Sequence, residues 1–365
     1  MNIDTALALP DLPKQLTQIM DKLCEHGYTA YIHGECVRGL IKGHTPLDFD
    51  LMTDAELARV RVIFENHHII KDNLQSGELI VTVLGVAARI TSYANLGTLS
   101  AGLANEHAFT LDAIAYSTKK GFDDPFKGMD DLKNNSLNFV LTGNKFNTAD
   151  IFPALACGSN GEFTISEGAK QLIKDSFAKS PDTPCVRADF EAIIMGKKAG
   201  EILREYSFII ESAIPELKMI NFDGGEPSGF NLLNHSYKAI GSSSPILTLR
   251  YALLFHELGK PDCHSKSPDG TDSYLGQYER GGIYASRIMT RFGCDPEDIK
   301  ETVLIIKNYS KAVHADEHNL KDMRDDLPSG LLKLLLLFNC ADYRAAPDEK
   351  TQKISMKFKK LATLL

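Results

Sequence analysis

The sequence predicts an α+β protein, in which a small mixed sheet with helices comes first and a mostly helical part follows. Short alternating or apolar runs, separated by Gly and Pro, fill much of the first third of the chain. Longer runs with apolar residues at helical spacing fill much of the rest. At 365 residues the chain is long enough for two or three domains with sizeable cores.

Composition narrows the class of protein. With 43% hydrophobic and 24% charged residues, the chain has the balance of an ordinary globular protein. Its formal net charge of −8 would not steer RNA toward it, so an RNA-binding role would need a local basic face. No apolar run reaches the ~18 residues of a membrane span. Seven scattered Cys without a Cys-x-x-Cys pair favour a reducing cytoplasm and argue against structural zinc.

Each element of the first part has its own signal in the sequence. Apolar residues from Leu12 to Leu23 share one helical face, and Gly27 would end that helix. Gly85 would turn a hairpin that lies beside a strand carrying Asp48 and Asp50. The elements predicted around them are a helix over 11–26, a strand over 28–32, a helix over 54–66 opened by Thr53 or Asp54 as N-cap, and strands over 79–84 and 87–91.

The stretch from Tyr31 to Thr53 carries the strongest functional signal. It reads as a strand end, a Gly turn, a short helix, a polar loop and a second strand with Asp48 and Asp50. Residues two apart in a strand share a face, so the two carboxylates should project together. Two carboxylates on a rigid strand suit Mg²⁺ and point to phosphoryl or nucleotidyl transfer.

This stretch resembles the head of the tRNA nucleotidyltransferase and poly(A) polymerase family. The sequence motifs of that head are Gly-Gly-x-Val-Arg-Asp, Leu-x-Gly and then Asp-x-Asp. The matching residues here are Gly34, Val37, Arg38, Leu40, Gly43, Asp48 and Asp50, with Glu35 at the position of the second Gly. The resemblance implies a polymerase-β-like nucleotidyltransferase head that binds Mg²⁺, ATP or CTP, and the 3′ end of an RNA such as tRNA. Asp48 and Asp50 would hold the metal, with Gly34 and Arg38 near the nucleotide.

The chain departs from the family at several ligand-handling positions. Arg89 replaces the third carboxylate of the family, and we expect its guanidinium to pair with both Asp48 and Asp50. Glu35 replaces a Gly that lets the backbone approach a triphosphate. The family's Arg-Arg-Asp becomes Glu106, His107 and Ala108, and of its base-selecting Glu-Asp-x-x-Arg only Asp150 remains, with Pro153 in place of the Arg.

The second part resembles the helical neck and body of the family, followed by an HD domain. Amphipathic helices are predicted over 164–178 and 188–214, the latter broken near Gly196, and residues 221–230 read as a linker. His235, His256, Glu257 and Asp342 correspond to the metal ligands of an HD domain and would suit one divalent transition metal. Tyr278 and Tyr309 replace two further family histidines. The alternative is that His235 and His256 only pack helices.

The predicted division is a head over 1–145, a helical neck and body over 146–220, and an HD-like domain over 221–365. Three functions stay open at this point: an active, cytoplasmic nucleotidyltransferase, a catalytically silent binding or regulatory scaffold, and an HD-type metal phosphohydrolase. Arg89, Glu35, Ala108 and Pro153 motivate the second. No membrane or DNA partner is expected, and the sequence decides neither which RNA is extended, nor whether CCA or poly(A) is made, nor the oligomeric state.

Overall fold

The computed structural model describes residues 12–65, 68–73, 77–141, 146–181, 183–221, 231–266 and 269–365. The chain divides into two compact units. The first, here called the head unit, comprises Met1–Asn147 and Thr164–Leu172. The second, the helical unit, comprises Thr148–Phe163 and Ile173–Leu365. The predicted linker over 221–230 lies outside the described residues from 222 onward, and the predicted three-part division remains a prediction.

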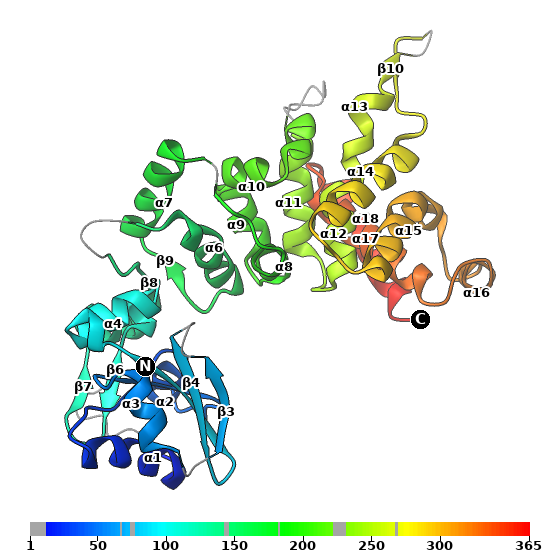
Figure 1. The fold of residues 1–365 in the computed structure, drawn as a ribbon. Helices are drawn as coiled ribbons and strands as arrows, with labels where there is room; N and C mark the ends of the chain where they lie inside the picture. Colours follow the sequence, from blue (N-terminus) through cyan, green and yellow to red (C-terminus); the bar gives the residue numbers. More distant parts are fainter. Residues whose placement is uncertain are drawn as a thin grey trace. The chain divides into compact units, whose positions relative to one another are not determined.

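The head unit is built on a mixed seven-stranded sheet in the order β3-β4-β5-β2-β1-β6-β7 (Figure 1). Its strands are β1 (Tyr31–His33), β2 (Phe49–Thr53), β3 (His68–Asn73), β4 (Glu78–Val83), β5 (Val86–Ser92), β6 (Ala115–Ser117) and β7 (Gly121–Asp123). Strand β2 runs parallel to β5, while the other neighbours pair antiparallel. A short parallel pair, β8 (Ser136–Leu137) with β9 (Thr164–Ile165), lies apart from this sheet.

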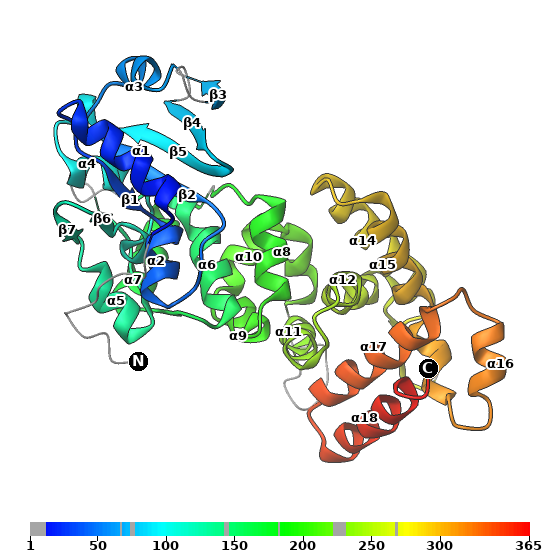
Figure 2. The same ribbon diagram turned by 90° about the horizontal axis from the view of Figure 1, so that it is seen from below.

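Helices of the head unit cover the sheet and hold its core. They are α1 (Lys14–Glu25), α2 (Glu35–Ile41), α3 (Leu57–Ile63), α4 (Leu99–Glu106) and α5 (Gly128–Asn134), and α7 (Glu167–Lys179) begins in this unit. Helix α1 contacts β4 and β5, and Figure 2 shows it crossing the sheet. Leu16, Ile19, Met20 and Leu23 are fully buried, as their helical spacing predicts.

Two of the boundaries in the head unit that differ from the sequence prediction are set by hydrogen bonds that the sequence pattern does not reveal. The first strand starts at Tyr31, because the Tyr28 amide closes the end of α1 on Leu23 and the Thr29 amide donates to Asp54 Oδ1. The side chain of Asp54 therefore accepts a hydrogen bond from Thr29 and does not cap α3, whose N-cap residue is Glu56. The hairpin of β4 and β5 forms beside β2 as predicted.

The helical unit contains little besides helices (Figures 1 and 2). They are α6 (Ile151–Asn160), α8 (Arg187–Met195), α9 (Ala199–Glu205), α10 (Ser207–Ala213), α11 (Leu232–Ser242), α12 (Leu247–Phe255), α13 (Lys260–Cys263), α14 (Gln277–Arg291), α15 (Pro296–Asn308), α16 (Leu320–Asp325), α17 (Leu331–Ala345) and α18 (Glu349–Ala362). The break at Gly196 is as predicted, and a second one falls at the fully buried Tyr206. Among the described residues, no helix is both long and apolar enough to cross a membrane. The fold is thus the predicted α+β arrangement.

Candidate functional site

A cavity of about 520 Å³ opens in the head unit between the start of α2 and the loop that precedes β2. Its lining residues are Glu35, Cys36, Gly39, His44, Thr45, Pro46, Leu47, Asp48 and Asp50. The volume is in the range of pockets that hold small ligands. Both carboxylates predicted to hold a metal therefore face the same space.

The two carboxylates reach the cavity in different ways. The sequence predicted that Asp48 lies on strand β2. The strand begins at Phe49, however, so Asp48 lies in the bend before it. Asp48 is exposed and makes no hydrogen bond or ion pair with any residue that the structure describes. Asp50 lies within β2 and is about one-third exposed, at 31%. The side chain of Phe49, between the two aspartates, is buried in the core.

Arg89 binds Asp50, but it does not pair with both aspartates as expected. It is the register partner of Asp50 on the parallel strand β5, so the two side chains share a face. Arg89 Nε donates to Asp50 Oδ1 at 2.6 Å, and Nη1 donates to Glu106 Oε2 at 3.2 Å. Burial alone would lower the pKa of Arg89, but Asp50 and Glu106 raise it. Asp48 stays outside this contact because it precedes the strand.

Glu106 is a site residue that sequence reasoning missed. The family that the motifs resemble has an acid at the position of Arg89 and an Arg at the position of Glu106. The structure brings the two positions together, and Arg89 Nη1 and Glu106 Oε2 form an ion pair there. Opposite charge changes at two motif positions were the signal that could have revealed it.

A buried pair of histidines lies beside these charges. His33 Nδ1 and His107 Nε2 are 2.7 Å apart, and the rings meet edge to face. Burial is the main cause of the low pKa of both rings: it lowers the pKa of His107 to about 4 and that of His33 well below its usual value. Both rings are therefore neutral at pH 7.

The Gly34 turn brings the backbone close to this pair. A Cβ at Gly34 would lie 3.0 Å from His107 Cε1 and 3.5 Å from Asp50 Oδ2. Gly34 also has a φ of 77°, which L side chains rarely adopt. Both the contact and the backbone conformation therefore require Gly at this position.

Arg38, predicted to lie near the nucleotide, is anchored within the protein. Its Nη1 donates to Asp112 Oδ1 at 2.7 Å, and its Nη2 lies 3.2 Å from Glu35 Oε1. Burial raises the pKa of Asp112 to about 6 although Arg38 opposes this effect. Glu35, which replaces a family Gly, thus points back to Arg38 from the rim of the cavity.

Asp150 and Pro153 belong to the helical unit and not to the head unit. Asp150 directly precedes α6, and burial raises its pKa. Pro153 lies in the first turn of α6, where a missing amide is tolerated. Ala108 directly precedes the bridge between Phe109 and Phe139 and has no side-chain chemistry of its own.

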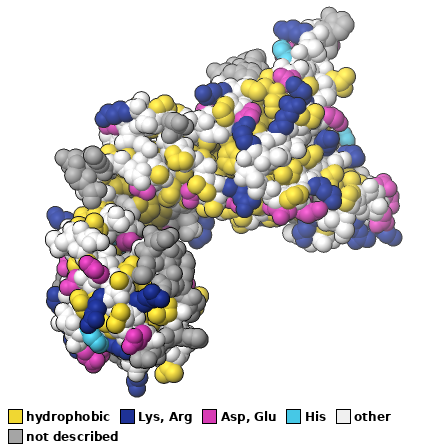
Figure 3. Space-filling view, in the orientation of Figure 1, with side chains coloured by type: hydrophobic (Ala, Val, Ile, Leu, Met, Phe, Trp, Pro, Cys, Tyr) yellow, Lys and Arg dark blue, Asp and Glu magenta, His cyan; other side chains and the backbone are white. Residues whose placement is uncertain are grey.

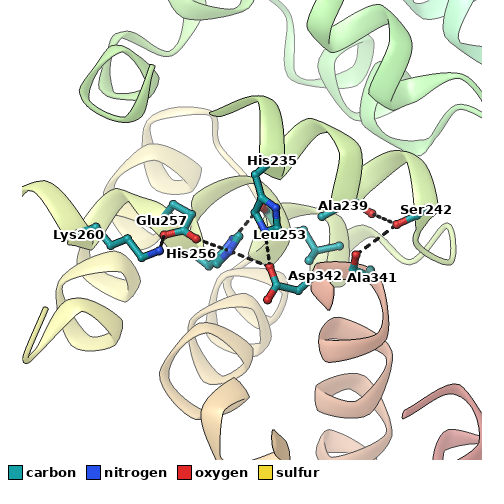
Figure 4. Close-up of polar contacts among 9 residues, drawn as sticks. All are labelled: His235, Ala239, Ser242, Leu253, His256, Glu257, Lys260, Ala341 and Asp342. Carbon is teal, nitrogen blue, oxygen red and sulfur yellow. Dashed lines mark hydrogen bonds and ion pairs between the residues drawn. The ribbon is translucent and has the colours of Figure 1, made fainter. Parts of the chain in front are cut away.

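The HD-like residues converge in the helical unit from three segments (Figure 4). His235 comes from α11, His256 and Glu257 follow α12, and Asp342 comes from α17. His235 Nε2 is 2.7 Å from Asp342 Oδ1, and His256 Nε2 is 3.2 Å from Glu257 Oε1 and 3.3 Å from Asp342 Oδ1. Ligand atoms of His235, His256 and Glu257 lie within 4.8 Å of one another.

Two features of this cluster bear on metal binding in opposite ways. His256 Nδ1 is 3.0 Å from the Leu253 carbonyl, which leaves Nε2 facing the carboxylates as a ligand atom would. Lys260 Nζ, however, already lies 2.8 Å from Glu257 Oε2. The rings of Tyr278 and Tyr309 pack together with centroids 4.7 Å apart, where the family has histidines.

The same cluster is strongly coupled by charge. Burial alone would lower the pKa of His256, but Glu257 and Asp342 raise it to about 10. Burial alone would raise the pKa of Glu257, but His256 and Lys260 lower it to about 2. In the absence of a metal, a proton on His256 and the Lys260 ammonium balance the two carboxylates.

Charged side chains are mixed on the visible surface. Figure 3 shows Lys and Arg of the helical unit in several small groups among Asp and Glu, and no continuous basic face on the side drawn. This agrees with the formal net charge of −8. Any attraction for a polyanion therefore has to be local.

Comparisons with known proteins agree with the motifs. No protein-family model matches the chain. The A-adding tRNA nucleotidyltransferase of Deinococcus radiodurans is 26% identical over 260 residues, which cover 65% of this chain and 58% of that protein. The CC-adding tRNA nucleotidyltransferase of Halalkalibacterium halodurans is 27% identical over 185 residues, which cover 50% of this chain and 48% of that protein. The chain thus spans about half the length of these relatives.

A solved structure extends the likeness to nearly the whole fold. The CCA-adding enzyme of Bacillus stearothermophilus, in complex with CTP, superposes with a TM-score of 0.59 at 18% identity and covers 95% of this chain and 82% of that one. Motifs, sequence relatives and fold therefore agree. The chain is similar in sequence to tRNA nucleotidyltransferases and to a poly(A) polymerase, and in fold to a CCA-adding enzyme.

Proposed function

We propose that this chain transfers nucleotides from ATP or CTP to the 3′ end of an RNA, at the head cavity that contains Asp48 and Asp50. The observation that carries the proposal is that both carboxylates line one cavity of about 520 Å³ with the start of α2, whose N-cap Gly34 lies close to Asp50. The named relatives, which add A or CC to tRNA, support tRNA as the acceptor.

The donors present fit one divalent ion. Asp50 Oδ2 accepts no hydrogen bond from the described residues, and both oxygens of Asp48 are open. Mg²⁺ prefers such carboxylate oxygens and, when bound, supplies positive charge to the triphosphate. The residues of the chain position the substrate: Gly34 lets the nucleotide approach the backbone, Arg38 faces its phosphates and Asp150 its base, as the family resemblance implies.

In this proposal the three sequence ranges keep distinct tasks. The head, residues 1–145, holds the phosphates of the nucleotide, the neck and body, 146–220, provide Asp150 for its base, and the HD-like domain, 221–365, carries a second metal site. We also propose that His235, His256, Glu257 and Asp342 hold one divalent transition metal, supported by the approach of their ligand atoms. Metal analysis of the purified chain beside its Asp342→Ala variant tests this second site.

Neither alternative function gains specific support. The relatives named above are all nucleotidyltransferases, and none is a phosphohydrolase. A silent scaffold is motivated by Arg89, yet Arg89 leaves Asp48 and one oxygen of Asp50 open. Arg89 is also shared with Glu106, at 3.2 Å, so it does not pair with the carboxylates of the cavity alone.

The test is extension of a tRNA that lacks its 3′ end, with labelled CTP or ATP and Mg²⁺. We expect the unmodified chain to extend the RNA, and Asp48→Ala and Asp50→Ala each to lower the rate about a hundredfold or more. Asp130→Ala, which removes an exposed acid on α5, is the matched control and should extend normally. No extension by the unmodified chain, together with no CTP or ATP binding by calorimetry, would refute the transferase.

A further inference from the structure

Arg89 stands at a point where two carboxylates converge from different elements. Asp50 comes from β2 and Glu106 from the last residue of α4. The guanidinium lies between them, at 2.6 Å from one and 3.2 Å from the other. All three side chains are only 23–33% exposed, so the charges attract more strongly than they would in open solvent.

The position of Glu106 increases the need for a cation at this point. The carbonyl end of a helix carries partial negative charge, and a carboxylate in the last turn adds to it. Helix α4 has no basic residue in its last turn. Without Arg89, therefore, Asp50 and Glu106 would lose the cation that they share, and the neighbouring His107 ring, whose pKa burial lowers to about 4, carries no charge to replace it.

A second metal ion does not fit at this place. Arg89 binds one oxygen of each carboxylate, Asp50 Oδ1 and Glu106 Oε2, and its guanidinium stays protonated at ordinary pH, so a fixed positive charge already occupies the space between them. Asp48 and Asp50 Oδ2, by contrast, remain open on the cavity side. The head therefore offers one cation position to a metal and fills the other with its own side chain.

We propose that Arg89 is a fixed cation in the place of a divalent ion between Asp50 and Glu106, so that the head binds one divalent ion and an acid at position 89 creates a site for a second. The inference relies on the proposed function only for the identity of the cavity. Its test measures ion binding and does not depend on turnover.

The experiment titrates Mn²⁺ into the full chain with α,β-methylene-ATP present and counts bound ions by electron paramagnetic resonance. Arg89→Glu should bind one more Mn²⁺ per chain than the unmodified protein, and Arg89→Gln should fall between them in affinity. Arg59→Glu makes the same change of charge at an exposed position of α3 and should leave the count unchanged. Ions held by the helical unit contribute equally to all four proteins and cancel in the comparison.

A thermal measurement covers the case in which Arg89→Glu folds poorly. In Arg89→Glu the new carboxylate would lie beside those of Asp50 and Glu106, and their repulsion would destabilise the fold. An ion that binds only the folded state should restore the melting temperature. Mn²⁺ should therefore raise the melting temperature of Arg89→Glu more than that of Arg59→Glu. An equal count and an equal rise in both variants would overturn the proposal, as would two ions in the unmodified protein that are both lost in Asp50→Ala.

These outcomes are separable from those of the extension assay. If the chain fails to extend RNA but Arg89→Glu gains an ion, the fixed cation stands and the transferase fails. If the chain extends RNA and Arg89→Glu gains no ion, the transferase stands and the fixed cation fails.

Discussion

Gly34 shows most clearly how one residue sets the geometry of the head site. Its φ of 77° and ψ of −149° belong to a region open almost only to Gly. A methyl group there would also meet the His107 ring at 3.0 Å. We expect Gly34→Ala to lower the free energy of unfolding by about 1–3 kcal/mol for the backbone, with an added cost for the contact. Urea unfolding measures both together.

Two further variants separate the contact from the backbone. Gly43 has a φ of 80° and no atom within 4 Å of an added Cβ, so Gly43→Ala should show a backbone cost alone. Gly34→Ala combined with His107→Ala should be less destabilised than the sum of the single variants, by about 1 kcal/mol. Strict additivity would show that His107 does not constrain Gly34.

At the same scale, the sequence located the residues of the site but not their bonds. The spacing of Asp48 and Asp50 predicts that their side chains lie close together, and both residues line the cavity. Spacing could not foresee that the strand would begin at Phe49, because a difference of one residue at a strand end depends on pairing with β1 and β5. The pairing of Arg89 with Glu106 depends on where α4 ends relative to β5, which no local pattern encodes.

Among the elements, the break between α8 and α9 depends on one buried arginine. Arg250, on α12, is 4% exposed. Its Nη1 donates to the carbonyls of Ile194 and Gly196 at 2.6 and 2.9 Å, and its Nη2 donates to the Ser243 carbonyl at 3.1 Å. One side chain thus satisfies the carbonyls at the end of α8 and at the turn between α11 and α12.

Arg250→Met should therefore destabilise the helical unit by about 3 kcal/mol, because it leaves buried carbonyls without donors. Arg291→Met is the matched control: it removes a bidentate ion pair with Glu216, at 2.6 and 2.9 Å, on the surface. That change should cost less than about 1 kcal/mol. Urea unfolding followed by circular dichroism compares the two, and equal losses would contradict the role given to Arg250.

The order of the elements was largely predictable, because it follows from periodicity and from Gly and Pro signals. The hairpin of β4 and β5 and the break at Gly196 are examples. Boundaries failed where side chains bonded across the fold. Asp54 looked like an N-cap, but it binds the Thr29 amide 25 residues away in sequence, and such a bond has no local signature.

For the whole molecule, the two units carry buried histidines of opposite kinds. In the head unit, His33 and His107 have lowered pKa values and stay neutral when folded. Their contribution to stability is complete above pH 6.5 and is lost as pH falls toward about 4. Asp112, with a pKa raised to about 6, opposes this loss in part.

In the helical unit the buried histidine makes stability depend on pH in the opposite direction. His256 has a pKa raised to about 10, so its contribution is complete below pH 6.5 and is lost as pH rises through 10. Glu257, with a pKa lowered to about 2, loses its contribution only below pH 4.5. A shift from pH 7 to pH 5 should therefore weaken the histidine pair of the head unit and leave this cluster of the helical unit unchanged.

The absence of Trp from the sequence makes this separation measurable, since one Trp can be placed in each unit as a fluorescent reporter. Tyr116→Trp reports on β6 of the head unit, and Phe208→Trp reports on α10 of the helical unit. We expect His107→Gln to reduce the loss of stability between pH 7 and pH 5 seen by the first reporter, by about 2 kcal/mol, because Gln takes up no proton. The second reporter should register no such difference. At pH 10.5 the head unit also loses stability, because burial raises the pKa of the Cys36 thiol to about 11. The role of His256 is therefore measured with His256→Gln, which should change the response to pH 10.5 at the second reporter alone. A change of equal size at both reporters would mean that the two units unfold as one, and that the opposite charge states of their buried histidines do not govern them separately.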